Sequence, residues 1–140
     1  FQMETGLSYG DTQVFDFSEY KNIDGHFVNI GERVKTGVQY VTELSDECME
    51  ILGRYDMSLP TLCNQDYNRC LRALGTAAGI DKRLHSHMAR HSFATMALAK
   101  GAKIENVSKM LGHTNITQTQ RYAKILAQSV IDDFRKVREK

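Results

Sequence analysis

The stretch His85-Ser-His-Met-Ala-Arg-His91 carries the most specific chemistry of this chain and stands at the start of a predicted helix. Positions 87, 90 and 91 are three and four residues apart, so His87, Arg90 and His91 share one face of that helix. A helix N-terminus attracts anions through its free N–H groups, and an arginine adds a planar fork that matches phosphate. The segment therefore predicts a phosphate site.

Two other interpretations of this segment stay open. His87 and His91 lie one helical turn apart and can ligate a metal, but a zinc-protease motif reads HExxH, and position 88 is methionine. A structural zinc domain would use His85 with these histidines, or the cysteines, and would unfold on chelation. A capped surface helix with incidental histidines fits as well, so the residue types alone do not decide.

The sequence around this segment is predicted to be mostly helical. Ser86 is the expected N-cap of a helix that continues to Lys100, with Gly101 as a left-handed stop. Cap residues and apolar residues at three- and four-residue spacing predict further helices. These cover about 46–55 with Ser45 as cap, the stretch from the cap Asn64 to Gly79, 104–111, a helical turn at 116–122 and a separate final helix from about Lys124.

The hydrophobic period changes in residues 26–42. His26-Phe-Val-Asn-Ile30 and Val38-Gln-Tyr-Val-Thr42 follow the strand period of two and are separated by the turn Lys35-Thr-Gly37. This pattern predicts a β-hairpin or a three-stranded meander. The predicted fold class is α+β and mostly α, a helical domain with one small antiparallel sheet of two or three strands.

Length and composition are typical of one globular domain, with 140 residues, 41% hydrophobic and 25% charged. No apolar stretch approaches the roughly 18–20 residues of a membrane span, and no signal segment opens the chain. We therefore expect a cytoplasmic protein with no membrane partner. Three cysteines (Cys48, Cys63 and Cys70) without CxxC spacing predict buried or partly buried reduced thiols.

Charge is unevenly distributed along the chain, although the net charge is only +1. Residues 1–65 hold four Lys/Arg and eleven Asp/Glu, a net of −7, whereas residues 66–140 hold fourteen and six, a net of +8. A basic half suits contact with a polyanion. Solvated lysines and arginines on amphipathic helices would give the same count, so charge alone does not decide.

Several short motifs occur in a fixed order. Thr5-Gly-Leu7 is followed by Lys35-Thr-Gly37, by the HxxRH pattern at 87–91, by Leu111-Gly-His113 and by Tyr122. Each motif is weak alone, but the ordered set, which spans residues 4 to about 126, resembles the catalytic domain of the tyrosine recombinases, the phage-integrase family. The resemblance implies one catalytic domain over residues 1–140, with the N-terminal DNA-binding domains of a longer protein absent.

The resemblance also implies a reaction and the residues that perform it. Tyr122 would attack a DNA phosphodiester, form a 3′-phosphotyrosyl bond and release a 5′-hydroxyl. His87 would take the phenolic proton, because a phenol of pKa near 10 is only about 0.1% ionised at pH 7. Arg90 would hold the non-bridging oxygens, Lys35 would protonate the departing oxygen and His113 would hydrogen-bond the phosphate. Ester exchange needs neither ATP nor a metal, so no cofactor is expected.

One position departs from the family pattern. The first family arginine normally follows Thr-Gly-Leu, where this chain has Ser8, as integrases of Bacteroides-type mobile elements do. On a strand, positions i and i+2 point to the same face, so Arg33 can reach the phosphate if Lys35 does. Arg33 is therefore the candidate for the missing charge, and a surface arginine or a backbone-phosphate contact is the alternative.

The remaining polar residues near these motifs receive lesser roles. His91 is expected to orient the site without touching DNA, His85 to lie on the surface, and neither is assigned a catalytic role. The expected DNA-binding residues are Arg33, Lys35, Arg90, His113 and Arg121.

The resemblance predicts a bacterial site-specific recombinase or integrase that integrates or excises a mobile element. Its expected partners are double-stranded DNA, further copies in a homotetramer linked by the C-terminal segment, and accessory DNA-bending proteins. A type IB topoisomerase would share the residue set but act as a monomer. Ser8 motivates another alternative, a catalytically impaired DNA-binding descendant that forms no covalent adduct.

Overall fold

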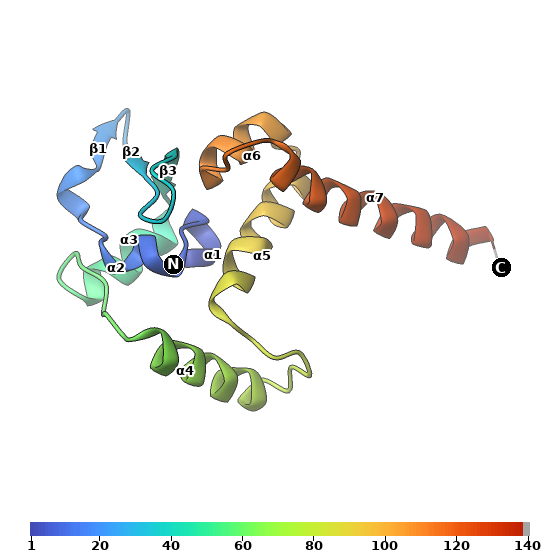
Figure 1. The fold of residues 1–140 in the computed structure, drawn as a ribbon, viewed down its shortest axis with the longest axis horizontal. Helices are drawn as coiled ribbons and strands as arrows, with labels where there is room; N and C mark the ends of the chain where they lie inside the picture. The colour runs from blue at the N-terminus through green and yellow to red at the C-terminus, as the bar shows by residue number, and fades with distance from the viewer. Residues whose placement is uncertain (139–140) are drawn as a thin grey trace.

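The computed structural model describes residues 1–138, and Figure 1 follows the chain through them. Its mostly helical α+β architecture with one small sheet confirms the predicted fold class. The elements in chain order are α1 (Gln2–Thr5), α2 (Tyr9–Gln13), the 3-10 helix η1 (Phe17–Glu19), β1 (Lys21–Ile23), β2 (His26–Glu32), β3 (Gln39–Leu44), α3 (Asp46–Arg54), α4 (Asn64–Ala77), α5 (Ser86–Ala99), α6 (Ile104–Leu111) and α7 (Thr117–Arg138).

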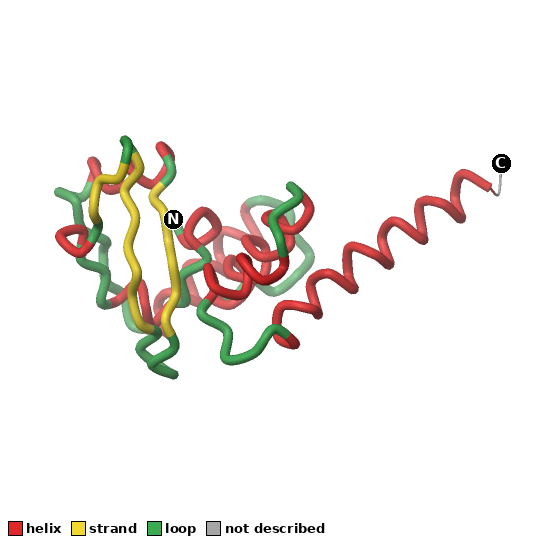
Figure 2. Tube along the Cα trace, turned by 90° about the horizontal axis from the view of Figure 1, so that it is seen from above, coloured by secondary structure: helices red, strands yellow, loops and turns green. Residues whose placement is uncertain are grey.

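The sheet is a three-stranded antiparallel meander in the order β1-β2-β3, which matches the longer of the two predicted forms. Burial alternates along β3, where Tyr40, Thr42 and Leu44 are buried and the residues between them are exposed. This alternation is the strand period read from the sequence. Figure 2 shows the sheet at one side of the molecule and the α5–α6 helices beside it.

Side-chain caps start the first two long helices, and one of them differs from the prediction. Ser45 accepts a hydrogen bond from the Cys48 amide at 3.3 Å and begins α3, as predicted. The cap of α4 is Cys63, whose Sγ accepts from the Asp66 amide at 3.5 Å. Asn64, the expected cap, is instead the first helical residue, because the extended backbone conformation falls on Cys63.

The start of α5 also differs from the prediction. Ser86, the expected cap, is the first residue of the helix, and His85 holds the cap position without a side-chain cap bond. The Ser86 amide donates to Oδ1 of Asn68, on α4, at 3.0 Å. A residue that is distant in sequence thus satisfies the free amide, and the bond ties α4 to the start of α5.

The C-terminal region is one continuous helix rather than a turn followed by a separate helix. No glycine or proline interrupts residues 116–138, so α7 runs from Thr117 to Arg138 without a break. Figures 1 and 2 show it projecting away from the body of the molecule. Ile125, Val130 and Phe134 on this helix are more than half exposed.

Two buried clusters form the core. One joins the sheet to α3, and the other joins α5, α6 and the start of α7. All three cysteines are free, as predicted, but the prediction that they are buried or partly buried holds for Cys48 alone, because Cys63 and Cys70 are exposed. The buried members are Tyr20, Leu44, Cys48 and Leu52 in the first cluster and Ala94, Val107, Leu111 and Tyr122 in the second.

Within residues 1–138, no helix is both long enough and apolar enough to cross a membrane. The same residues contain no group of three or more histidine, cysteine or acidic side chains placed to hold a metal ion.

Gly6 lies where α1 meets the second cluster. Its φ is +70°, and a Cβ added there would stand 2.6 Å from the Phe93 ring and 3.1 Å from Leu111. Both the left-handed conformation and the close approach require glycine. Gly53 on α3 contrasts with it, because a Cβ there meets nothing within 4 Å.

Substituting these two glycines should therefore have opposite effects on the free energy of unfolding. Gly6→Ala should destabilise the fold by about 2–4 kcal/mol through backbone strain and overpacking. Gly53→Ala should stabilise it by up to about 1 kcal/mol, since alanine is the better helix former. Urea denaturation measures both; an unchanged midpoint for Gly6→Ala would contradict the close packing of α1.

Candidate catalytic pocket

One pocket gathers the residues that the sequence singled out. Its walls come from the β2–β3 turn, from α5, from the segment between α6 and α7, and from the first turns of α7. The predicted residues that line it are Arg33, Lys35, His87, Arg90, His113, Arg121 and Tyr122, and His91 lies among them. Residues from distant parts of the sequence thus surround one cavity.

Arg90 is the buried cation of this pocket, with 7% of its surface exposed. Its Nη1 donates to the Gly6 carbonyl at 2.8 Å, and its Nη2 donates to the Leu111 carbonyl. Among residues 1–138, it takes part in no ion pair with a carboxylate. Burial, with the charge of Arg33, lowers the pKa of Arg90 to about 10, so the group is still charged at neutral pH.

Arg33 lies beside Arg90 and is held from two sides. Its Nη1 donates to the Leu111 carbonyl at 3.0 Å, and its Nε lies 2.7 Å from Oδ2 of Asp11. The Nε–H is not aimed at the carboxylate, so this contact is an ion pair without a hydrogen bond. Asp11 is buried as well, and its Oδ1 accepts the Val34 amide at 2.9 Å.

The strand argument for Arg33 and Lys35 is wrong in its geometry. Strand β2 ends at Glu32, and residues 33–38 form the turn, closed by a bond from the Arg33 amide to the Val38 carbonyl at 2.9 Å. The two side chains nevertheless line the same pocket. Arg33 is mostly buried against Asp11, whereas Lys35 is exposed on the turn.

Two guanidinium groups therefore converge on one carbonyl oxygen. Arg33 and Arg90 both donate to Leu111, and Asp11 is the only carboxylate paired with either of them among the described residues. Like charges so close repel each other, and an anion in the pocket would relieve that repulsion. The arrangement is suited to binding a phosphate.

Gly112 allows the hairpin that carries Arg33 to come close to the end of α6. It ends α6 in the left-handed conformation with φ +60°, and a Cβ there would stand 2.9 Å from Cγ of Arg33 and 3.1 Å from Cβ of Tyr40. A larger residue would push the β2–β3 turn away from α6. The Leu-Gly-His motif thus serves to pack the hairpin against the helix end.

Tyr122 is buried on the second turn of α7, with 8% of its surface exposed. Its hydroxyl lies 2.5 Å from Nδ1 of His91, and the two ring centroids are 5.5 Å apart. Burial raises the pKa of Tyr122, while the charges of Arg90 and Arg121 oppose that rise. Burial and the neighbouring histidines lower the pKa of His91, which favours the neutral imidazole. In the tautomer with its proton on Nε2, Nδ1 accepts a hydrogen bond from the phenol.

The histidine in contact with the tyrosine is thus not the predicted one. His87 lies one turn before His91 on α5, with the two ring centroids 6.5 Å apart. It lines the pocket, but the described hydrogen bond of the Tyr122 hydroxyl goes to His91. His113 donates to or accepts from Oγ1 of the buried Thr119 at 2.7 Å through Nδ1. Burial, with the charge of Arg90, lowers the pKa of His113 to about 4.

Ser8 lies outside this pocket and has a structural task. Its hydroxyl caps α2 by accepting the Asp11 amide at 3.2 Å, and it donates to Oδ2 of Asp11 at 2.6 Å. The serine thus helps to hold the carboxylate that pairs with Arg33.

Sequence reasoning missed one residue and one contact that build the site. Asp11 carries no motif of its own, and only the fold brings it to Arg33. His91 was expected to orient the site without a catalytic role, and its contact with Tyr122 was not foreseen because that contact depends on how α7 crosses α5.

The architecture is that of tyrosine recombinase catalytic domains. The fold superposes on the crystal structure of XerA recombinase with a TM-score of 0.68 and 26% identity, over 86% of this chain and 48% of that chain. It also resembles the Tn1549 transposon integrase in complex with circular intermediate DNA, with a TM-score of 0.65 and 15% identity, over 86% of this chain and 52% of that one.

Comparison of the sequence with known families shows to which family the chain belongs. Residues 59–129, half of the chain, match the phage integrase family, and the chain belongs to it. The tyrosine recombinase XerD of Bifidobacterium longum is 41% identical over 64 residues, which are 46% of this chain and 21% of that protein. The chain thus spans about a fifth of the length of that relative.

The buried ion pair between Asp11 and Arg33 yields a stability prediction. Asp11→Ala should destabilise the fold by about 3–5 kcal/mol, because it leaves the Arg33 charge uncompensated in a buried site. Glu50→Ala, which breaks the exposed pair with Arg54, should cost less than about 1 kcal/mol. Chemical denaturation of both variants tests this; equal losses would mean that the Asp11 pair is as solvated as the surface pair.

Proposed function

We propose that this chain is the catalytic domain of a site-specific DNA recombinase or integrase that cleaves and rejoins strands through a 3′-phosphotyrosyl intermediate. The observation that carries the proposal is the convergence of Arg33 and Arg90 on the Leu111 carbonyl, in the pocket that also holds Tyr122. Two fixed cations beside a buried phenol are suited to in-line attack on a phosphodiester.

The first task of the site is to stabilise the negative charge of the scissile phosphate. The two non-bridging oxygens of the scissile phosphate gain charge as the fifth bond forms, and Arg33 and Arg90 bind them in the proposed reaction. Both guanidinium groups are held by backbone carbonyls or by Asp11 before DNA arrives, so little reorganisation is needed. Arg33 thereby supplies the charge that Ser8 lacks.

Proton transfer is the second task. As Oη of Tyr122 bonds to phosphorus, its proton passes to Nδ1 of His91, which lies 2.5 Å from that oxygen. The bond from phosphorus to the 5′-oxygen breaks, and that oxygen takes a proton from Lys35 on the exposed turn. His91 thus takes the role that was predicted for His87. In the reverse step, the 5′-hydroxyl of a second strand attacks and releases Tyr122.

The other residues of the pocket support the phosphate. His113 is neutral and faces the same cavity, so it can donate a hydrogen bond to a non-bridging oxygen. Arg121, exposed beside Tyr122, contacts the DNA backbone in this proposal. No proposed step uses a metal or nucleotide.

The proposed substrate is double-stranded DNA at the attachment site of a mobile element. The likeness to a transposon integrase in complex with DNA supports this assignment. The exposed apolar residues of α7, among them Ile125, Val130 and Phe134, support assembly with further copies of the chain on DNA. The homotetramer and the accessory DNA-bending proteins stay predictions.

Tyr122→Phe tests the nucleophile. The variant keeps the buried ring and loses only the hydroxyl, so folding should persist while the denaturant-stable protein–DNA adduct disappears. The assay uses the full-length protein and a nicked duplex that carries its attachment site. Tight DNA binding by wild type without any adduct would instead support the impaired DNA-binding descendant.

Arg33→Gln tests whether Arg33 supplies the positive charge that Ser8 lacks. The rate of adduct formation should fall by about 10²–10³-fold, the loss typical of removing one donor to a developing oxyanion. Because this variant leaves Asp11 buried and unpaired, the double variant Arg33→Gln/Asp11→Asn separates folding from chemistry. Recovery of stability without recovery of rate is the expected result. A rate equal to that of Arg54→Gln, an exposed arginine, would exclude Arg33.

His91→Asn tests the proton acceptor. Wild-type adduct formation should slow as the pH falls through the lowered pKa of His91, because protonated imidazole cannot accept the proton. The variant keeps a hydrogen-bonding group but no base, so its rate should be low and should lose this acid limb. His26→Asn, at an exposed histidine of β2, is the control. If adduct formation by His91→Asn depended on pH as wild type does, His87 rather than His91 would be the proton acceptor.

A further inference from the structure

One buried hydroxyl next to the pocket has no task in the proposed chemistry. It belongs to Thr119, in the first turn of α7, which has 0% of its surface exposed. Its Oγ1 lies 2.7 Å from Nδ1 of His113, and among residues 1–138 this is the only hydrogen bond of that hydroxyl. Buried polar groups are expected to be hydrogen-bonded, so the direction of this one bond matters.

The surroundings of the bond decide which atom donates. Burial lowers the pKa of His113 to about 4, so its ring is neutral at pH 7 and carries one proton. The hydrogen bond made by one ring nitrogen determines which nitrogen holds that proton. If Nδ1 donated, the proton of the buried hydroxyl would have no described acceptor, which is costly. Thr119 therefore donates to Nδ1, and the proton of His113 is on Nε2.

The backbone of His113 is fixed as well. Its amide donates to the Ser108 carbonyl at 3.1 Å, directly after Gly112 ends α6. Within residues 1–138, Nε2 takes part in no described hydrogen bond, and His113 lines the pocket. With Nδ1 occupied by Thr119, the remaining donor of the ring is available to a ligand in that pocket.

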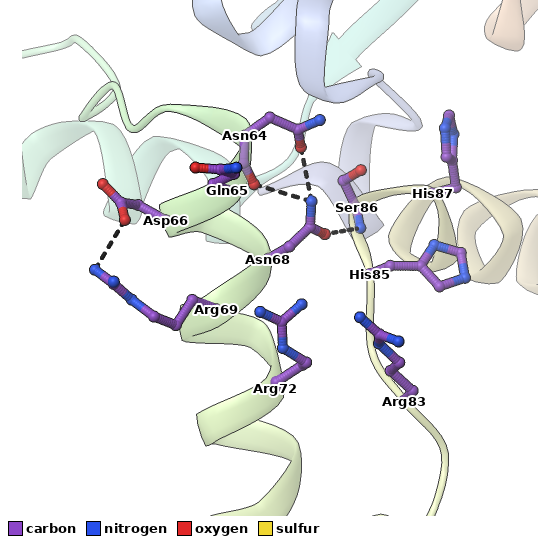
Figure 3. A pocket seen from close by; sticks show the side chains of 10 residues that line it. All are labelled: Asn64, Gln65, Asp66, Asn68, Arg69, Arg72, Arg83, His85, Ser86 and His87. Carbon is purple, nitrogen blue, oxygen red and sulfur yellow. Dashed lines mark hydrogen bonds and ion pairs between the residues drawn. The ribbon is translucent and has the colours of Figure 1, made fainter.

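Other histidines near the pocket are not held in this way. His85 and His87, whose rings Figure 3 shows at the start of α5, take part in no hydrogen bond among the residues that the structure describes. The ring of His113 is thus set in one orientation by the fold. A donor that is aimed in advance needs no reorganisation when charge develops on its partner.

We propose that Thr119 is a positioning residue, which donates to Nδ1 of His113 and thereby directs the Nε2–H of that ring at a non-bridging oxygen of the scissile phosphate. The proposal rests on the proposed function for the identity of that oxygen. Thr119 and Tyr122 lie three residues apart on α7, and both are buried. One helical turn thus places the nucleophile and, through Thr119, also orients a donor to the phosphate that Tyr122 attacks.

Two substitutions at Thr119 separate this task from packing. Thr119→Val keeps the shape of the side chain and removes the hydroxyl, whereas Thr119→Ser keeps the hydroxyl and removes a methyl group. With the full-length protein and the nicked duplex, Thr119→Val should slow adduct formation by about 10–100-fold, the loss typical of a misplaced group, and Thr119→Ser should stay near the wild-type rate. The reverse order would mean that Thr119 only packs, and would overturn the proposal. Thr42→Val, at a buried threonine of β3 outside the pocket, is the control.

A double variant tests whether Thr119 acts through His113. In a His113→Phe background, Thr119→Val should cause no further loss of rate, because the group that it orients is already absent. A further loss in this background as large as in wild type would overturn the proposal.

Nitrogen-15 NMR of the full-length protein with labelled histidine tests the orientation without DNA, since protonated and unprotonated ring nitrogens give distinct signals. The His113 signals, assigned by their loss in His113→Phe, should show the proton on Nε2 at neutral pH. Thr119→Val should shift the Nδ1 signal, and Thr119→Ser should leave it in place. A proton on Nδ1 in wild type would overturn the proposal, even if wild type forms the adduct and the recombinase function stands. The expected signals without any wild-type adduct would instead overturn the proposed function, and with it the phosphate as the partner of Nε2.

Discussion

The carbonyl oxygen of Leu111 is the point on which the site depends. It accepts hydrogen bonds from Arg33 of the hairpin and Arg90 of α5, and it belongs to the last residue of α6, where α-helical carbonyls lack an intrahelical partner. The free acceptor at a helix end thus becomes the anchor that brings two like charges together. Asp11 and the Gly6 carbonyl complete the set of acceptors that hold them there.

Fold and site are therefore built from the same contacts. Gly6 packs against the Phe93 ring and also offers its carbonyl to Arg90, and Gly112 ends α6 and lets Arg33 pass beside it. Each is required because a Cβ would separate the elements that carry the cations.

The uneven charge of the chain acquires a structural meaning. The acidic half supplies Asp11, which neutralises one cation and positions it, whereas the basic half exposes Arg72 and Arg83 without carboxylate partners among the described residues. The charge of the pocket nevertheless comes from both halves, since Arg33 belongs to the acidic half and Arg90 to the basic half, and both are held there by carbonyl or carboxylate oxygens.

The sequence by itself determined the mostly helical class, the meander and the set of residues that meet in the pocket, because helix and strand periods are local and the ordered motifs are specific. Predictions from local sequence patterns failed where the hydrogen-bond partner of a residue is distant in sequence. Ser86 does not cap α5 but is its first residue, and its amide donates to the distant Asn68. Arg33 reaches the pocket from a turn rather than from a strand. The pairing of His91 with Tyr122 arises only when α7 packs on α5, since hydrogen bonds between helices depend on how the helices cross and not on residue spacing.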